Sequence, residues 1–332
     1  MPSQHRPSHE AYGESKSFDE LHRLEEEQSQ EAKVRTLLAE GIPTLPAYVF
    51  ELTTLLNTAP VDLRSVCRVI RTDPSLAAQV IRLCNSALLG AREKVSSIED
   101  AVILLGRERL RTLVLTCSLV EGVGQSLSPT GLQSFWQHSL LAATLSERSA
   151  LCLHYPRPER AYLAGLLHDV GALPLLLRAI SSHEINFTAG PVIWGESVEL
   201  ERKHFGVDHC LIGKFIGTSW NFSAEVIDVL EHHHRPQDAR QDALLVETVA
   251  TADLICKMHG VRVGGEPFRV ELADQNKYKN LIERCAPSLT GRETRELAKT
   301  LEVEFPDIIK LIELQVSGIQ AGGVRPWPDL WR

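Results

Sequence analysis

The stretch Ala161-Tyr-Leu-Ala-Gly-Leu-Leu-His-Asp-Val-Gly171 is the most informative part of this chain. It is an apolar helical run that ends in two adjacent metal-capable side chains, His168 and Asp169. A carboxylate in such surroundings is costly unless a cation or a protonated base lies beside it. The doublet therefore predicts either a metal site or a hydrogen-bond network that fixes how helices pack.

Similar polar residues recur at five other positions with apolar neighbours. They are His138, His209, His233, His234 and Asp253. Helical periodicity places each of them on the inward face of its own helix, and His138, for example, shares a face with Phe135 and Leu141. Histidine and aspartate are common ligands of divalent transition metals. Together with His168 and Asp169, these residues make seven candidate metal ligands.

Each candidate also has a simpler interpretation. A single histidine in an apolar helix is often a buried neutral imidazole that is hydrogen-bonded to backbone or to a carboxylate. Asp253 has an alternative partner in Lys257, one helical turn later. His232 is excluded from the ligand set because periodicity places it with Asp228 on the polar side of its helix. These alternatives stay open at the level of sequence.

Composition narrows the class of protein. The chain has 332 residues, 43% hydrophobic and 23% charged, which is typical of a globular protein with room for two or three units. A net charge of −8 argues against nucleic-acid binding. No apolar run is long enough for a membrane span or a signal peptide. Seven scattered cysteines without a CxxC spacing indicate reduced thiols. We therefore expect a cytoplasmic protein without membrane or nucleic-acid partners.

Helical signals dominate the chain, and strand-like alternation is nearly absent, so the predicted fold class is all-α. Capping boxes at Ser17 with Glu20 and at Ser96 with Glu99 mark two helix starts. Asp73-Pro74 marks a third, with the proline at the first helical position. The sequence contains no Walker loop, no dinucleotide-binding G-x-G-x-x-G loop and no G-x-S-x-G nucleophile motif.

Seven ordered segments between residues 42 and 255 resemble the HDOD family, the HD-related output domain of bacterial signalling proteins. The segments are Ile42-Pro-Thr-Leu-Pro46, residues 70–86, 95–106, Phe135-Trp-Gln-His-Ser139, Ala164-Gly-Leu-Leu-His-Asp-Val-Gly171, Gly206-Val-Asp-His209 with Gly213 and Trp220, and His233-His-Arg-Pro236. The resemblance implies a two-lobed helical HDOD fold, with an N-terminal lobe over 42–125 and a lobe similar to HD phosphohydrolases over 126–260. A disordered start and N-terminal helical extension over 1–41 and a C-terminal helical extension over 261–332 flank them.

The family is similar to the HD-GYP phosphodiesterases but is mostly regarded as regulatory. The order of the seven candidates resembles the metal-ligand order of the catalytic relatives. Two features depart from their pattern. Ala172 stands where they commonly have a lysine, three residues after the aspartate, and Arg235-Pro-Gln follows the paired histidines in place of Gly-Tyr-Pro. A lost cation weakens the case for phosphate binding and charge stabilisation.

We therefore expect first a bacterial signal-transduction module that acts through protein–protein contacts, without catalysis and without catalytic residues. The resemblance implies partners among signalling proteins such as two-component or cyclic-dinucleotide enzymes, and the N-terminal helix could pair in a homodimer. The alternative is a phosphohydrolase acting on a nucleotide or cyclic dinucleotide with iron, manganese, nickel or zinc. A third hypothesis is a nucleotide sensor that binds between the lobes without hydrolysis. Convergence of the seven side chains on one point would favour the metal reading.

Overall fold

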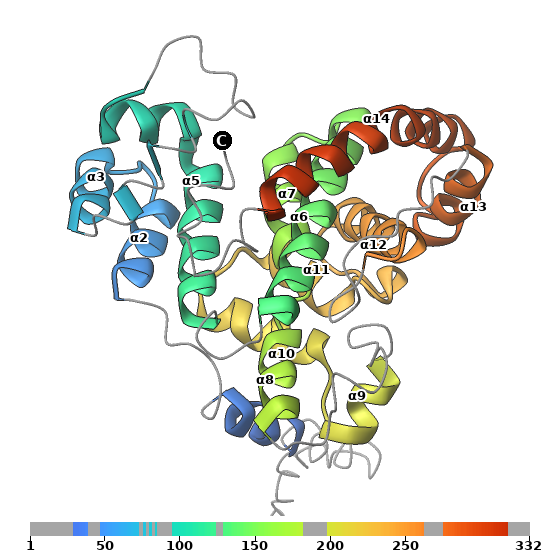
Figure 1. Cartoon of the computed structure of the whole chain (residues 1–332), viewed down its shortest axis with the longest axis horizontal. Helices are drawn as coiled ribbons and strands as arrows, with labels where there is room; N and C mark the ends of the chain where they lie inside the picture. The colour runs from blue at the N-terminus through green and yellow to red at the C-terminus, as the bar shows by residue number, and fades with distance from the viewer. Residues whose placement is uncertain are drawn as a thin grey trace, which may run out of the picture.

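The computed structural model describes residues 29–38, 47–72, 76–77, 80–81, 84, 95–123, 129–181, 198–261 and 275–317 (Figure 1). Every regular element within these ranges is helical, which confirms the predicted all-α class. Besides a helix over 29–38, they are α2 (Ala47–Asn57), α3 (Leu63–Thr72), α5 (Ile98–Val123), α6 (Pro129–Cys152), α7 (Pro158–Leu167), α8 (Ala172–Ser181), α9 (Val198–Phe205), α10 (His209–Ser219), α11 (Ala224–His232), η1 (Pro236–Asp238), α12 (Ala243–Met258), α13 (Gln275–Cys285) and α14 (Gly291–Ser317). None of the helices in this part of the chain combines the length and apolarity needed to cross a bilayer.

Helices α2, α3 and α5 pack against one another (Figure 1). The apolar side chains between them, including Leu52, Val66 and Ile70, are almost completely buried. Helix α5 is kinked at Gly106, which has φ of 70° and ψ of 173°. Only glycine adopts this conformation readily, so the helix that starts at Ile98 is kinked at this residue.

The predicted cap of α5 is wrong by one residue. The capping oxygen belongs to Ser97 and not to Ser96. Its Oγ accepts a hydrogen bond from the amide of Asp100 at 3.1 Å and donates one to the Asp100 carboxylate at 2.5 Å. Consecutive serines give the same sequence signal, and only the backbone path selects between them. The predicted capping box at Ser17 and the predicted helix start at Asp73-Pro74 lie outside the described residues.

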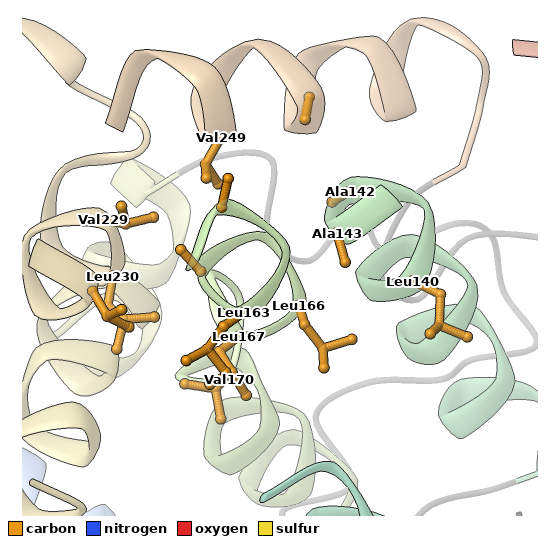
Figure 2. Close-up of a cluster of buried hydrophobic side chains, with 14 of the residues drawn as sticks. Leu140, Ala142, Ala143, Leu163, Leu166, Leu167, Val170, Val229, Leu230 and Val249 are labelled. Carbon is orange, nitrogen blue, oxygen red and sulfur yellow. The ribbon is translucent and has the colours of Figure 1, made fainter. Parts of the chain in front are cut away.

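Helix α7 lies at the centre of the second group of helices, with α6, α11 and α12 around it (Figure 2). Its Leu163, Leu166 and Leu167 are at most 2% exposed and pack in the core. A methyl group on Gly165 would lie 2.7 Å from Ser146 Oγ and 2.9 Å from the Ala142 carbonyl oxygen. Small residues on α7 thus let the backbone of α6 approach closely.

A second close approach joins α7 to α10. A Cβ on Gly171 would overlap the His209 carbonyl oxygen and lie 2.6 Å from the Gly213 amide nitrogen. No side chain larger than hydrogen fits between these backbones. The glycine therefore brings the chain just after α7 against the first turn of α10, and it places Asp169 beside His209.

The helix over 29–38 is part of the packed structure. Val34 is fully buried in the main hydrophobic core. Lys33 lies over Gly206, because a Cβ there would be 2.9 Å from Lys33 Nζ. The sequence predicted an N-terminal helical extension in this region, and its described part lies against the turn between α9 and α10. The predicted division of the chain into lobes and extensions stays a prediction.

Candidate metal centre

The seven candidate ligands come from five parts of the chain, each at or near a helix end or in the middle of a buried helix. His138 lies in α6 and Asp253 in α12, while His209 is the first residue of α10. His168 and Asp169 directly follow α7, and His233 and His234 directly follow α11. Six of the seven are at most 2% exposed, and His234 is half-buried. The structure thus brings all seven predicted residues together, although they span more than 100 positions of sequence.

The first half of the centre consists of His138, His168, Asp253 and one oxygen of Asp169. His138 Nε2 lies 3.2 Å from Asp169 Oδ2 and 3.2 Å from Asp253 Oδ1. His168 Nε2 lies 3.3 Å from Asp169 Oδ2 and 3.6 Å from Asp253 Oδ1. One ligand atom from each of the four residues lies within 4.8 Å of every other, a spacing compatible with a single cation.

The second half consists of His209, His233 and His234 together with the other oxygen of Asp169. Asp169 Oδ1 lies 3.4 Å from His209 Nε2 and 3.4 Å from His233 Nε2. His234 Nε2 lies 3.0 Å from His209 Nε2. The two carboxylate oxygens of Asp169 therefore face two different sets of imidazoles, so that this residue can bridge two cations.

Hydrogen bonds from the outer nitrogen to backbone carbonyls fix the direction of three of the rings. Nδ1 of His138 donates to the Val261 carbonyl at 3.0 Å, and Nδ1 of His168 donates to the Gly165 carbonyl at 2.7 Å. Nδ1 of His233 donates to the Val229 carbonyl at 3.1 Å. A carbonyl only accepts, so these nitrogens carry a hydrogen, and Nε2 of each ring points at the centre, where its lone pair would bind a cation that displaces any proton held there. Metal-binding histidines are commonly held in this way.

The inner nitrogens lie closer together than neutral rings favour. The Nε2 atoms of His138 and His168 are 3.1 Å apart, and those of His209 and His233 are 3.2 Å apart. Two lone pairs at this distance repel each other unless a proton or a cation lies between them. Both carboxylate oxygens of Asp169 and Asp253 Oδ1 are buried without a hydrogen-bond partner. These donor atoms fit a pair of divalent cations, because orphaned buried oxygens and imidazole nitrogens are what such ions bind.

The two halves differ in charge. Burial alone would lower the pKa of His168, but the carboxylates of Asp169 and Asp253 raise it to about 10. Burial opposes ionisation of Asp169 as well, yet His168 and His138 hold its pKa well below the usual value. In the second half, burial lowers the pKa of His233 and His234, and for His234 the neighbouring His233 and Lys257 lower it further. Burial also opposes protonation of His209 in the second half, but Cys210 and Glu201 raise its pKa well above the usual value. Without metal, the first half and His209 therefore hold protons, whereas His233 and His234 are neutral.

Two residues near the centre were missed in the sequence. Glu201 of α9 is 2% exposed, and its Oε2 accepts hydrogen bonds from both the amide and Nδ1 of His209, at 2.8 and 2.7 Å. Its helix is rich in charged residues, so that periodicity gives no sign of a buried carboxylate. For Cys210 the sequence indicated only a reduced thiol, but its Sγ lies 3.5 Å from His209 Nε2, within the second half.

Two further positions refine the sequence prediction. His232 is absent from the centre, as predicted, but it is 3% exposed and not on a polar face. Its Nδ1 lies 3.1 Å from Asp228 Oδ1, and these two buried residues form a separate network. Lys257 does pair with Asp253, at 2.7 Å from Oδ2, while Oδ1 of the same carboxylate faces the histidines. The two interpretations of Asp253 are therefore compatible. Ala172, which stands where the catalytic relatives commonly have a lysine, is buried. The positive side chain next to the centre is Lys257, through its ion pair with Asp253.

Known proteins resemble this chain over most of its length. A structure of an HDOD domain protein of unknown function from Geobacter sulfurreducens has 25% identity and a TM-score of 0.63, covering 86% of this chain and 98% of its own. A provisionally assigned phosphohydrolase from Shewanella amazonensis has 26% identity and a TM-score of 0.52, covering 81% of this chain and 98% of its own.

A protein of Treponema pallidum (strain Nichols) is 25% identical over 244 residues, which is 68% of this chain but only 45% of that protein. The chain thus spans less than half the length of this relative. The HDOD domain family itself matches residues 42–236, more than half of the chain. Six of the seven candidate ligands lie within this match, and Asp253 follows it. With the fold and its histidine and aspartate centre, this match shows that the chain belongs to the HDOD domain family.

Proposed function

We propose that this HDOD protein is a metal-dependent phosphohydrolase that acts within bacterial signal transduction. The observation that carries the proposal is the position of Asp169, whose two oxygens lie against two separate sets of histidines. A carboxylate between two nitrogen-rich sets of ligands suits a two-metal hydrolase. The likeness to the Shewanella protein provisionally assigned as a phosphohydrolase also supports it.

His138, His168, Asp169 and Asp253 would hold one cation, and Asp169, His209, His233 and His234 would hold the other. When bound, such a pair polarises a phosphoryl oxygen and lowers the pKa of a water molecule. The chain itself contributes the fixed direction of the rings. Carbonyl groups hold Nδ1 of His138, His168 and His233, and Glu201 holds Nδ1 of His209.

The donor set also bears on which metal binds. Imidazole and carboxylate ligands suit iron, manganese, nickel and zinc, the metals expected from the sequence. Cys210 adds a soft sulfur atom next to the second half, where Sγ lies 3.5 Å from His209 Nε2. A thiolate ligand favours zinc or iron over manganese. We therefore propose zinc or iron in the second half.

A regulatory protein without catalysis, the first expectation from the sequence, is the second candidate. Its support is the burial of the centre, in which six ligands are at most 2% exposed, together with Ala172 in place of the expected lysine. In this case the centre would specify how the helices pack, and output would come from contacts with other signalling proteins. Loss of metal would then change stability and partner binding without any loss of turnover.

Turnover assays separate the two candidates. The full chain, loaded with manganese, iron or zinc, is assayed with bis-p-nitrophenyl phosphate and p-nitrophenyl phosphate as diester and monoester probes. We expect hydrolysis of at least one probe by the wild type and none by Asp169→Asn, with the helical circular-dichroism spectrum unchanged. Equal rates for the loaded wild type and for Asp169→Asn would contradict a phosphohydrolase and support the regulatory role.

A further inference from the structure

A cavity of about 720 Å³ lies between the helix over 29–38, helix α10 and the segment that follows α11. It is called the arginine cavity below. Its volume lies in the range of pockets that bind small molecules of nucleotide size. The lining includes polar and charged residues from four separate elements, and the side chains used below are Arg35, Arg202, Asp208, Cys210, Leu211, Lys214, Phe215, Glu231 and Arg240.

Positive charge dominates the cavity. Five of its lining residues are arginine or lysine, and three are carboxylates. Two of these carboxylates are already matched, because Asp208 pairs with Arg202 at 2.6 Å and Glu231 pairs with Lys214 at 2.8 Å. No ion pair with any described residue engages Arg35 or Arg240, whose guanidinium groups remain available to an anion.

The cavity wall around Arg240 is fixed by a buried carboxylate. Asp228 is 4% exposed and accepts hydrogen bonds from the amides of Arg240, Gln241 and Asp242, at distances of 2.7 to 3.3 Å. Such a carboxylate with several amide donors holds its loop firmly. Arg240 is therefore presented from a rigid backbone, not from a loose surface segment.

The opposite wall is fixed by packing. Val34 on the helix over 29–38 is fully buried, and Lys33 on the same helix lies over Gly206. Arg35 follows Val34 in the sequence and lines the cavity. The two unpaired guanidinium groups thus come from two anchored elements that are 205 positions apart in the numbering.

The cavity also touches the metal centre. Cys210 lines it, and the Sγ of this residue lies 3.5 Å from His209 Nε2 of the second half. Leu211 and Phe215, on the same helix, add half-buried apolar surface to the lining. The arginine cavity therefore has a cationic part and an apolar part, and the side chain of Cys210 separates it from the metal centre.

We propose that the arginine cavity binds a phosphorylated small molecule of nucleotide size. Arg35 and Arg240 bind its phosphate groups, and Phe215 packs against its apolar ring. Arginine is suited to phosphate because its planar donors form paired hydrogen bonds with the oxygens. That this ligand is the substrate of the metal centre rests on the proposed function, whereas binding itself requires no metal.

Calorimetric titration of the metal-free full chain with ADP, GDP and inorganic pyrophosphate tests binding, and adenosine serves as the uncharged probe. We expect ADP or GDP to bind and adenosine to bind at least tenfold more weakly. Arg35→Gln and Arg240→Gln should each weaken nucleotide binding roughly 10- to 100-fold, the effect of losing one charge-assisted contact. The matched control is Arg295→Gln, an exposed arginine on α14 outside the cavity, which should leave binding unchanged. Binding of none of the three phosphate probes, or equal affinity in the wild type and both cavity variants, would overturn the proposal.

Failure of the cavity and failure of the proposed function give different results. If Asp169→Asn and the wild type bind the nucleotide equally and neither hydrolyses any probe, nucleotide binding in the cavity is supported and the phosphohydrolase activity is contradicted. If the loaded wild type hydrolyses the diester probe but Arg35→Gln and Arg240→Gln change neither nucleotide affinity nor KM, the phosphohydrolase activity is supported and nucleotide binding in the cavity is contradicted.

Discussion

The two halves of the metal centre share Asp169 but are built differently. The first half adds a second carboxylate, that of Asp253, and all four residues of this half are buried. The second half adds three imidazoles and the thiol of Cys210, which also lines the arginine cavity. In the first half, the carboxylates of Asp169 and Asp253 outweigh burial and raise the pKa of both imidazoles. In the second half only the pKa of His209 is raised, and burial keeps His233 and His234 neutral. The difference suggests that the first half anchors the centre and that the second half meets the ligand.

Loss of the shared ligand should have the largest effect. Asp169→Asn removes the charge that both halves use, so metal affinity should fall in both by more than the roughly 10- to 100-fold that loss of an outer-shell partner costs. Metal content after desalting, measured by mass spectrometry, should drop from two ions per chain to none. The matched control is Asp238→Asn, the same change on an exposed residue of η1. If Asp169→Asn kept both ions, the bridge would be excluded.

Variants of the unshared ligands should separate the halves. Asp253→Asn changes only the first half, and His234→Gln changes only the second, so each should retain one ion per chain. Native mass spectrometry of the two variants measures this directly. Loss of both ions from either variant would mean that the halves act as one unit and that the comparison drawn above is invalid.

The contact that holds the halves together can be broken without touching a ligand. In Gly171→Ala, the new methyl group would collide with the backbone of α10 at His209 and Gly213. Overpacking against backbone costs about 3 kcal/mol in the free energy of unfolding, and it should also move His209 away from Asp169. Urea denaturation measures the free energy of unfolding, and the metal content per chain reports whether His209 still lies beside Asp169.

A matched glycine provides the control for this change. A Cβ on Gly291, at the start of α14, would meet nothing within 4 Å. Gly291→Ala should therefore be neutral or stabilising by up to about 1 kcal/mol. Equal free energies of unfolding and equal metal contents for Gly171→Ala and Gly291→Ala would contradict the close approach of α10 to the residues after α7.

The smallest effect is expected from the residue that orients His209. Glu201→Gln retains the shape of the side chain but removes the charge that holds Nδ1 of His209. Affinity for the second ion should fall roughly 10- to 100-fold while affinity for the first is unchanged. Titration with a chromophoric chelator as competitor resolves the two steps. An equal loss at both steps would place the action of Glu201 outside the second half.

Much of the centre could be predicted from the sequence because buried polar residues stand out in apolar helices. Periodicity placed His138, His209 and Asp253 on inward faces, and the structure brings them together. Periodicity gave no signal in α9, which is rich in charged residues, and it placed one histidine on the wrong side of α11. Glu201 was missed among the charged residues of α9, and His232 was assigned to the polar side although it is buried with Asp228.

Other features depend on tertiary geometry alone. No pattern in the sequence indicates which oxygen of Asp169 faces which histidines, because that depends on how α7, α10 and α11 meet. The arginine cavity was not predicted either, since Arg35 and Arg240 are distant in sequence and each resembles an ordinary surface residue. The choice between Ser96 and Ser97 as the cap of α5 likewise depends on the backbone path.

The most direct test of the two-metal centre is anomalous diffraction at the absorption edge of the metal that copurifies with the full chain. The account predicts two peaks, one beside Oδ2 of Asp169 among His138, His168 and Asp253, and one beside Oδ1 among His209, His233 and His234. A single peak on one side of Asp169, or no peak in crystals of protein prepared without chelator and supplied with divalent metal, would contradict it.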